Sequence, residues 1–207
     1  IRYSTRKTFL AVSDYLQYMP NLSAILEKRP DVKKAITMPD GKIWSLPRVE
    51  EMGLVMHPNL FFMNKNWLLK LVNDGSINFL KASDVKDGLD LTVDQLGQIL
   101  EYFKGDMNGN GKSDEIPLNF VYNNYFQGNQ ADLYAAFGFP ANVDFRTVID
   151  GKVTNMAVLD EYYQAVNYYA DWVQRKLIPT NVFENSEETF LASGKGVEKL
   201  GAFYWWE

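Results

Sequence analysis

Apolar and polar positions alternate along the chain with two different periods. Short apolar runs bounded by polar residues predict strands at residues 60–64, 116–122 and 200–205, and we expect the first of these to be buried. Apolar residues three and four positions apart predict helices at residues 65–72, 92–104, 130–138, 159–177 and 187–192. Asp-Gly turns predict hairpins at residues 36–47 and 147–155. This alternation of strands and helices, without internal repeats, predicts an α/β architecture.

For two of the expected helices, the sequence also indicates where the helix begins or ends. Thr92 and Gln95 form a capping box, which places the start of one helix at Thr92 and its end before Gly105. The longest helix is expected to end before Pro179 and to bury one apolar stripe. We expect this stripe to consist of Leu159, Tyr162, Tyr163, Val166, Tyr169, Ala170, Val173 and Leu177.

Composition narrows the class of protein. The 207 residues are 46% hydrophobic and 23% charged, which is typical of a globular protein and excludes a disordered chain. There is no cysteine, so a disulfide scaffold is excluded, and the net charge of −5 argues against a nucleic-acid partner. No apolar run approaches the roughly 20 residues of a membrane span. Because the chain starts at Ile1 and stops directly behind an apolar run, we expect it to be a piece of a larger protein.

The sequence DMNGNGKSDE, residues 106–115, is the most specific motif. Oxygen-bearing side chains stand at alternate positions and a glycine stands at the sixth, as at the start of an EF-hand calcium loop. Alternate spacing lets one loop place several oxygens around a single hard cation. The alternative is an Asn/Gly-rich turn that binds nothing. The expected calcium ligands are Asp106, Asn108, Asn110, the carbonyl of Lys112, Asp114 and Glu115.

The loop departs from an EF-hand at its end. An EF-hand has a bidentate glutamate at position twelve, where this chain has Pro117, so Glu115 would close the ring two residues early. A strand rather than a second helix follows. We therefore expect a structural calcium ion that stiffens a helix-to-strand corner and offers no open position for chemistry.

A run of amides and rings follows the motif. Residues 116–130 contain no charged residue and interleave asparagine and glutamine with phenylalanine and tyrosine. Amides donate and accept hydrogen bonds and rings cover the apolar faces of a sugar, so the run suits a neutral saccharide. The alternative is a strand with buried rings that leads into a polar loop. For Trp205 and Trp206 the same two alternatives hold, a ring that stacks on a ligand or a ring in the core. Successive residues of a strand face opposite sides, so only one of the two can face the core.

Little in the sequence indicates catalysis. His57 is the only histidine, and it has no cysteine or other nucleophile nearby, so a histidine-based triad is not expected. Zinc sites need several histidines or cysteines. A pair of carboxylates for glycoside hydrolysis stays open, because sequence does not give their separation.

Several of these segments, in this order, resemble a known family. They are PDVKKAITMPDGKIWSLP, FFMNKNWLLKL, DMNGNGKSDEIPL and DGKVTN, followed by the tyrosine-rich helix and the aromatic strand. The chain resembles the extracellular solute-binding proteins of bacterial ABC importers for oligosaccharides, and the loop resembles that of a subset that includes the alginate-binding proteins. In that subset the loop holds calcium. The resemblance implies a two-lobed, periplasmic-binding-protein-like fold of type II with a ligand cleft between the lobes.

The resemblance also assigns segments and ligand residues. Residues 1–58 correspond to the end of the first lobe and the crossover, and residues 59–207 to the first long segment of the second lobe, which dominates this partial chain. The implied ligand-binding residues are Asn123, Asn124, Tyr125, Trp205 and Trp206, with Arg48 as a ligand-facing charge.

The expected function is capture of an oligosaccharide outside the membrane and delivery to the permease subunits of an ABC importer, without enzymatic activity. The resemblance implies a monomer that lies outside the cytoplasm, either free in the periplasm or held at the cell surface by a lipid anchor that this chain lacks. A non-sugar, peptide-like cargo, a glycoside hydrolase or lyase fragment, and a lectin-type module that binds glycans through an open calcium ion are the alternatives.

Overall fold

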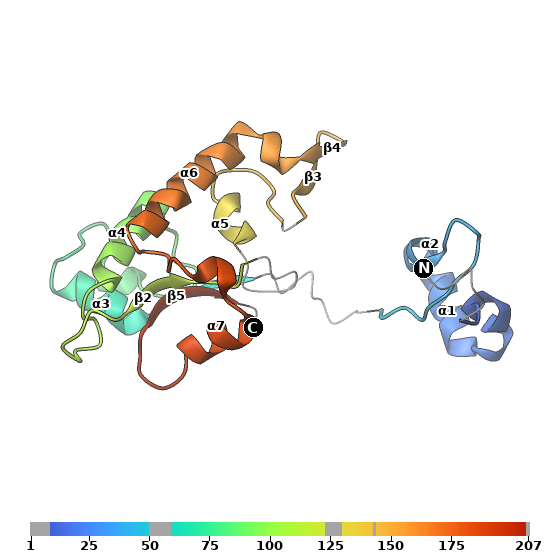
Figure 1. Cartoon of the computed structure of the whole chain (residues 1–207), viewed down its shortest axis with the longest axis horizontal. Helices are drawn as coiled ribbons and strands as arrows, with labels where there is room; N and C mark the ends of the chain where they lie inside the picture. Colours follow the sequence, from blue (N-terminus) through green and yellow to red (C-terminus); the bar gives the residue numbers. More distant parts are fainter. Residues whose placement is uncertain (1–8, 50–58, 123–129, 143, 206–207) are drawn as a thin grey trace. The chain divides into compact units, whose positions relative to one another are not determined.

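The structure is a computed structural model of the 207-residue chain, and it describes residues 9–49, 59–122, 130–142 and 144–205 (Figure 1). The chain divides into two compact units, Ile1–Met56 and His57–Glu207, and each is described by itself.

The first unit is a small helical assembly. A 3-10 helix, η2 (Val12–Tyr18), precedes α1 (Pro20–Lys28) and α2 (Pro30–Ile36), and both α-helices begin at a proline, whose fixed φ suits the first helical position. The hairpin expected at residues 36–47 is present only as a turn closed by a single antiparallel bridge between Thr37 and Ile43. Flanking strands are absent among the described residues of this unit.

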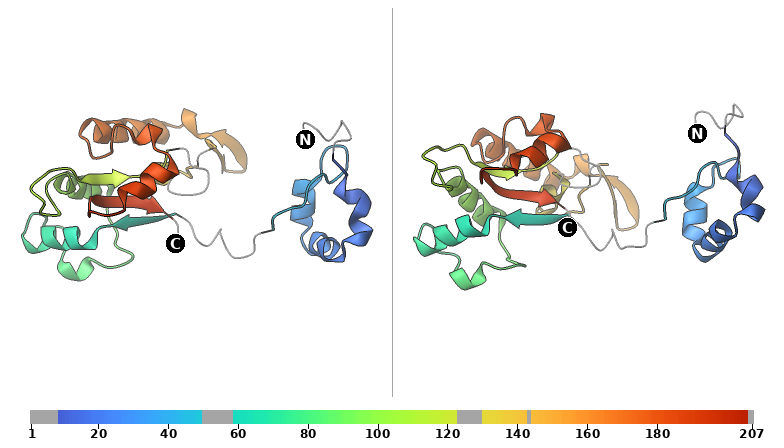
Figure 2. Two further views of the ribbon diagram at one scale, coloured as in Figure 1. Left: turned by 60° about the horizontal axis from the view of Figure 1, so that its bottom comes forward. Right: turned by 90° about the horizontal axis from the view of Figure 1, so that it is seen from below.

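The second unit is built around a three-stranded mixed sheet. The strands are β1 (Leu60–Met63), β2 (Ile116–Asn119) and β5 (Leu200–Trp205), and β5 lies between the other two (Figure 2). β5 pairs antiparallel with β1 and parallel with β2. The expectation of a buried first strand is wrong, because β1 is an edge strand and Leu60 is 39% exposed.

Helices and one hairpin complete this unit. The helices are α3 (Lys65–Asn73), η3 (Ala82–Asp84), α4 (Val93–Phe103), α5 (Ala131–Ala135), η4 (Met156–Val158), α6 (Asp160–Gln174), η5 (Val182–Glu184) and α7 (Glu187–Ser193). The hairpin joins β3 (Arg146–Ile149) and β4 (Lys152–Asn155) through Asp150 and Gly151, both with positive φ, as a two-residue turn between twisted strands requires. The mixture of helices and strands confirms the predicted α/β class.

Side-chain caps fix where two of these helices begin. Thr92 accepts a hydrogen bond from the Gln95 backbone N–H at 3.2 Å, and the Gln95 side chain accepts one from the Thr92 N–H at 2.9 Å. This capping box is the one that the sequence predicts. Ser186 caps α7 without a capping box, through a bond from the Thr189 N–H to its side-chain oxygen.

The core of the second unit forms where α4, α6 and the sheet meet. The Trp172 ring lies so close to Gly97 that a β-carbon on Gly97 would be 3.2 Å from it. The stripe predicted for α6 is therefore partly wrong. The helix buries Ala165, Tyr169 and Trp172, whereas Tyr163 is 70% exposed. Two neighbouring faces of α6 are apolar, and contact with α4 selects the one that carries Trp172.

We predict that Gly201→Ala destabilises the fold by about 1–3 kcal/mol. A β-carbon at this position in β5 would lie 2.6 Å from the Phe103 ring and 2.8 Å from the carbonyl oxygen of Pro117. Chemical denaturation measures the change. Gly194→Ala is the control, because the nearest atoms to its new β-carbon are 3.9 Å away. Equal stabilities of the two variants would contradict the close packing of β5.

Candidate metal centre and ligand-binding edge

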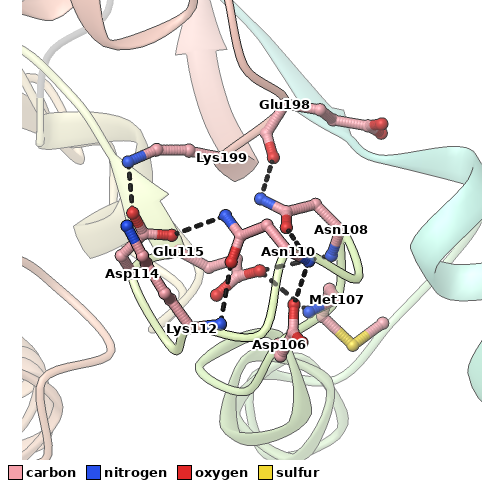
Figure 3. Close-up of polar contacts among 9 residues, drawn as sticks. All are labelled: Asp106, Met107, Asn108, Asn110, Lys112, Asp114, Glu115, Glu198 and Lys199. Atoms are coloured by element: carbon pink, nitrogen blue, oxygen red, sulfur yellow. Dashed lines mark hydrogen bonds and ion pairs between the residues drawn. The ribbon is translucent and has the colours of Figure 1, made fainter.

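The loop at residues 106–115 connects the end of α4 to the start of β2 (Figure 3). Gly109 and Gly111 have φ of 73° and 79°, a left-handed conformation that residues with a β-carbon rarely adopt. The two glycines let the chain turn twice within ten residues, so that the loop folds back on the side chains of Asp106 and Asn108.

The first half of the loop turns its side-chain oxygens inward. Asp106 accepts hydrogen bonds at 2.9 Å from the backbone N–H groups of Asn110 and Gly111. The Asn108 side-chain oxygen also accepts from the Asn110 N–H, at 3.0 Å, and the Asn110 side-chain oxygen accepts from the Lys112 N–H, at 2.8 Å. These hydrogen bonds connect four of the six predicted ligand residues within the loop.

Glu115 closes the loop from its far end. The residue is only 8% exposed, and its Oε1 accepts hydrogen bonds from the backbone N–H groups of Met107, at 2.9 Å, and Asn108, at 3.2 Å. Among the described residues, its buried Oε2 has no hydrogen-bond partner. An unpaired carboxylate oxygen is costly to bury, and a bound cation would satisfy it.

Asp114 contacts a residue that the sequence analysis did not connect with the loop. Its Oδ2 forms an ion pair with Lys199, and its Oδ1 accepts from the Asn110 side-chain amide at 3.2 Å. The Lys199 ammonium is the main reason that the pKa of Asp114 lies below its usual value. Asp114 is therefore ionised and available as an oxygen donor at neutral pH.

The carboxylates do not form a preassembled cage. Within the described ranges, no three His, Cys, Asp or Glu side chains meet in an arrangement that could hold a metal ion. The predicted ligand set relies on carboxylates for only three of its six members, and the others are two amide oxygens and one backbone carbonyl. The donors fit a hard cation such as calcium, which takes oxygens of all three kinds.

Two hydrogen bonds to backbone carbonyls join the loop and the start of β2 to the residues that immediately precede β5. The Asn108 side-chain amide donates to the carbonyl of Glu198 at 2.8 Å, and the Ile116 N–H donates to the carbonyl of Lys199 at 2.7 Å. Figure 3 shows Glu198 and Lys199 beside the loop. Glu198 and Lys199 are distant from the loop in sequence, and no pattern in the sequence could have shown their role.

The predicted ligand-binding residues of the second unit follow β2 or lie at the end of β5 in the sequence. β2 and β5 are parallel, so both end at the same edge, and ligands of α/β folds bind beyond the carboxyl ends of strands. Asn123, Asn124 and Tyr125 follow β2 and Trp206 follows β5, but all four lie outside the described residues. Among the predicted ligand-binding residues at the ends of β2 and β5, the structure describes Trp205.

Trp205 packs on an aromatic neighbour. Its ring is stacked on Phe190 of α7, with centroids 5.1 Å apart and an interplanar angle of 20°. Both rings line a pocket of about 350 Å³ along β5, to which Phe203, Leu191, Val197 and the segment 198–200 also contribute. Trp205 is half-buried, so part of the indole surface is open to a ligand.

Arg48, the other predicted ligand residue, lies in the first unit, and its side chain is exposed.

Asp132 at the start of α5 is a half-buried residue with a buried carboxylate oxygen, Oδ2, and no pattern in the sequence indicated it. Burial raises its pKa, and a hydrogen bond from Asn59, which immediately precedes β1, opposes part of that effect. Within the described part of the chain, its Oδ2 has no hydrogen-bond partner. The sequence gives no signal for this pair, because the two residues come together only when the sheet forms.

The chain is 34% identical over 219 residues to the fructooligosaccharide ABC transporter substrate-binding protein FusA of Streptococcus pneumoniae. The match covers all of this chain and 37% of the length of FusA. No protein-family model matches.

Solved structures of ABC-transporter solute-binding proteins also match this chain. A structure of FusA in complex with kestose matches with a TM-score of 0.80 and 33% identity, over all of this chain and 40% of that one. A structure of a FusA EF-hand mutant in complex with fructo-nystose matches equally well, with 32% identity. An HMO-binding, ABC-transporter-associated solute-binding protein of Bifidobacterium longum infantis matches with a TM-score of 0.67 and 27% identity, over 96% of this chain and 40% of that one.

The predicted resemblance to oligosaccharide-binding proteins of ABC importers is confirmed in sequence and in fold. The chain spans well under half the length of the proteins that it matches. The described helices include none that is long and apolar enough to cross a membrane.

We predict that Asp132→Asn makes the fold more stable at pH 7, by up to about 1 kcal/mol, because it removes the charge of a half-buried carboxylate. The raised pKa means that the folded state binds the proton more tightly than the unfolded state. The stability of the unmodified chain should therefore fall as pH rises from about 4 through the folded pKa, and the variant should lack this slope.

Urea denaturation at pH 4 and pH 7 measures both effects of Asp132→Asn. Asp87→Asn, at an exposed position, should change stability by less than about 0.5 kcal/mol at either pH. A variant at position 132 that is less stable than the unmodified chain at pH 7 would show that the charge is favourable where it lies.

Proposed function

We propose that the chain is part of the substrate-binding component of an ABC importer, which captures an oligosaccharide outside the membrane and delivers it to the permease. The observation that carries this proposal is the match of the whole chain to FusA, at 34% identity in sequence and a TM-score of 0.80 in structure. Identity at this level over the entire chain supports a shared type of ligand. The protein binds and releases its ligand, and no bond is made or broken.

The proposed architecture has two lobes that close on the ligand. Residues 1–58 would be the end of the first lobe and the crossover, and residues 59–207 the first long segment of the second lobe. The division of the chain into the units Ile1–Met56 and His57–Glu207 supports this assignment. Hinge closure of two lobes around a ligand is a common way to convert binding into a new surface, which the permease would recognise.

The loop at residues 106–115 is proposed to hold a structural calcium ion. Asp106, Asn108, Asn110, the carbonyl of Lys112, Asp114 and Glu115 would supply the oxygens. The buried Oε2 of Glu115, which lacks a partner among the described residues, supports this, and so does the existence of an EF-hand mutant of FusA. The ion would neutralise the carboxylates and fix the corner between α4 and β2.

The ligand is proposed to bind at the edge of the sheet beyond β2 and β5. Trp205, Trp206 and Tyr125 would stack on sugar rings, Asn123 and Asn124 would bond to hydroxyl groups, and Arg48 of the first unit would face the ligand. The partly exposed Trp205 ring supports this assignment, because stacking on Phe190 holds the indole in place before a ligand arrives.

The location is proposed to be outside the cytoplasm, where FusA-like proteins meet their substrates before import. The protein would act as a monomer, either in the periplasm or anchored by a lipid, with the permease subunits as its protein partners. A net charge of −5 gives no support for a nucleic-acid partner.

Ligand binding is tested by titrating the protein with kestose and following tryptophan fluorescence. We expect a saturable change, and we expect Trp205→Ala to weaken binding by at least about tenfold, since losing a ring contact worth about 1.5 kcal/mol has that effect. Trp205→Phe should retain part of the affinity and confirms that the site folds. Tyr163→Ala, which removes a ring that is 70% exposed on α6, is the matched control.

The other outcomes of this titration separate the alternatives. Saturable binding of peptides but of no saccharide in a broad panel would favour a peptide-like cargo for the same class of transporter. Turnover of the saccharide would contradict the proposal and favour a glycoside hydrolase or lyase.

Calcium binding is tested by thermal unfolding in calcium and in chelator. We expect calcium at about 100 times its dissociation constant to stabilise the protein by about 2.7 kcal/mol. Glu115→Gln should abolish most of this gain, because the amide keeps an oxygen for the Met107 N–H but loses the charge. Glu27→Gln, an exposed change in α1, should leave the gain intact. Equal unfolding temperatures in calcium and chelator for the unmodified protein would contradict the proposed site.

A further inference from the structure

Lys199 is the one cation that the described residues place in an ion pair with the loop at 106–115. Its ammonium contacts the Oδ2 of Asp114, and both side chains are about one-third exposed (35% and 34%). Figure 3 shows Lys199 reaching from the beginning of β5 to Asp114. The carboxylate that it contacts is one of the proposed calcium ligands.

The backbone around Lys199 is held firmly against the loop. The Ile116 N–H bonds to the Lys199 carbonyl, and the Asn108 side chain bonds to the carbonyl of Glu198. The side chain of Glu198 also accepts a hydrogen bond from Asn64 at 2.5 Å. These bonds hold the backbone of Lys199 beside the loop, within reach of Asp114 for its side chain.

Two cations lie close to the carboxylates of the loop. Asp106, Asp114 and Glu115 contribute three negative charges, while Lys112 within the loop and Lys199 outside it contribute one positive charge each. Removing the Lys199 charge would change the net charge of this group from −1 to −2. The site would then attract a divalent cation more strongly, since charge tunes the affinity of calcium loops.

We propose that Lys199 sets the affinity of the calcium site by sharing the Asp114 carboxylate with the ion. This rests on the proposed function of the loop. The ammonium repels the incoming cation and competes for one of its ligands, so it weakens calcium binding. In the protein without calcium, the Lys199 ammonium neutralises part of the negative charge of the carboxylates and so stabilises the loop.

The test measures the calcium affinity of the whole protein by isothermal titration calorimetry. Lys199→Met should bind calcium about five- to tenfold more tightly than the unmodified protein. Lys199→Arg keeps the charge and should stay within about twofold. Lys195→Met removes a charge from the exposed connection between α7 and β5, and it should also stay within about twofold.

A second measurement separates this role from a merely structural one. In chelator, Lys199→Met should unfold at a lower temperature than the unmodified protein, whereas in saturating calcium the difference should disappear or reverse. Weaker or unchanged calcium binding by Lys199→Met, with lower stability in both conditions, would overturn the proposal. If the unmodified protein binds no calcium, the proposed calcium site itself is wrong, and that result is distinct from the failure of Lys199→Met to tighten binding.

Discussion

Pairing of β5 with both β1 and β2 is the constraint on which the second unit depends. The strand begins beside the loop at 106–115 and ends at Trp205, so one element connects the proposed calcium site to the proposed ligand edge. Gly201 lets it approach Phe103 and Pro117 closely, and Phe203 and Trp205 turn toward Phe190 of α7. A shift of β5 would therefore disturb both sites at once.

The proposed calcium site gives this strand a fixed starting point. The loop is bonded to Glu198 and Lys199 just before β5, and these two residues also line the pocket that contains Trp205. A cation at the loop would neutralise carboxylates that otherwise repel one another, and it would hold the corner between α4 and β2 rigid. Rigid support for an aromatic ring lowers the entropy lost when a ligand stacks on it.

Local signals in the sequence were sufficient to predict many of the helices, strands and turns. The capping box at Thr92, the bounds of β5 and the hairpin at Asp150 each depend on a few adjacent residues, and all were predicted. Contacts between distant segments were not predictable. Gly97 selects the buried face of α6 through Trp172, Lys199 reaches Asp114 across 85 positions, and Asn59 meets Asp132 only in the folded sheet. The positions predicted for Asn123, Asn124, Tyr125 and Trp206 stay predictions.

Equilibrium dialysis of the protein against kestose, followed by chromatography of the recovered sugar, distinguishes capture of an oligosaccharide from its hydrolysis. We expect one equivalent of sugar bound per protein chain and recovery of all the kestose intact. Release of smaller sugars, or the absence of any retained saccharide across a panel of neutral oligosaccharides, would contradict this expectation.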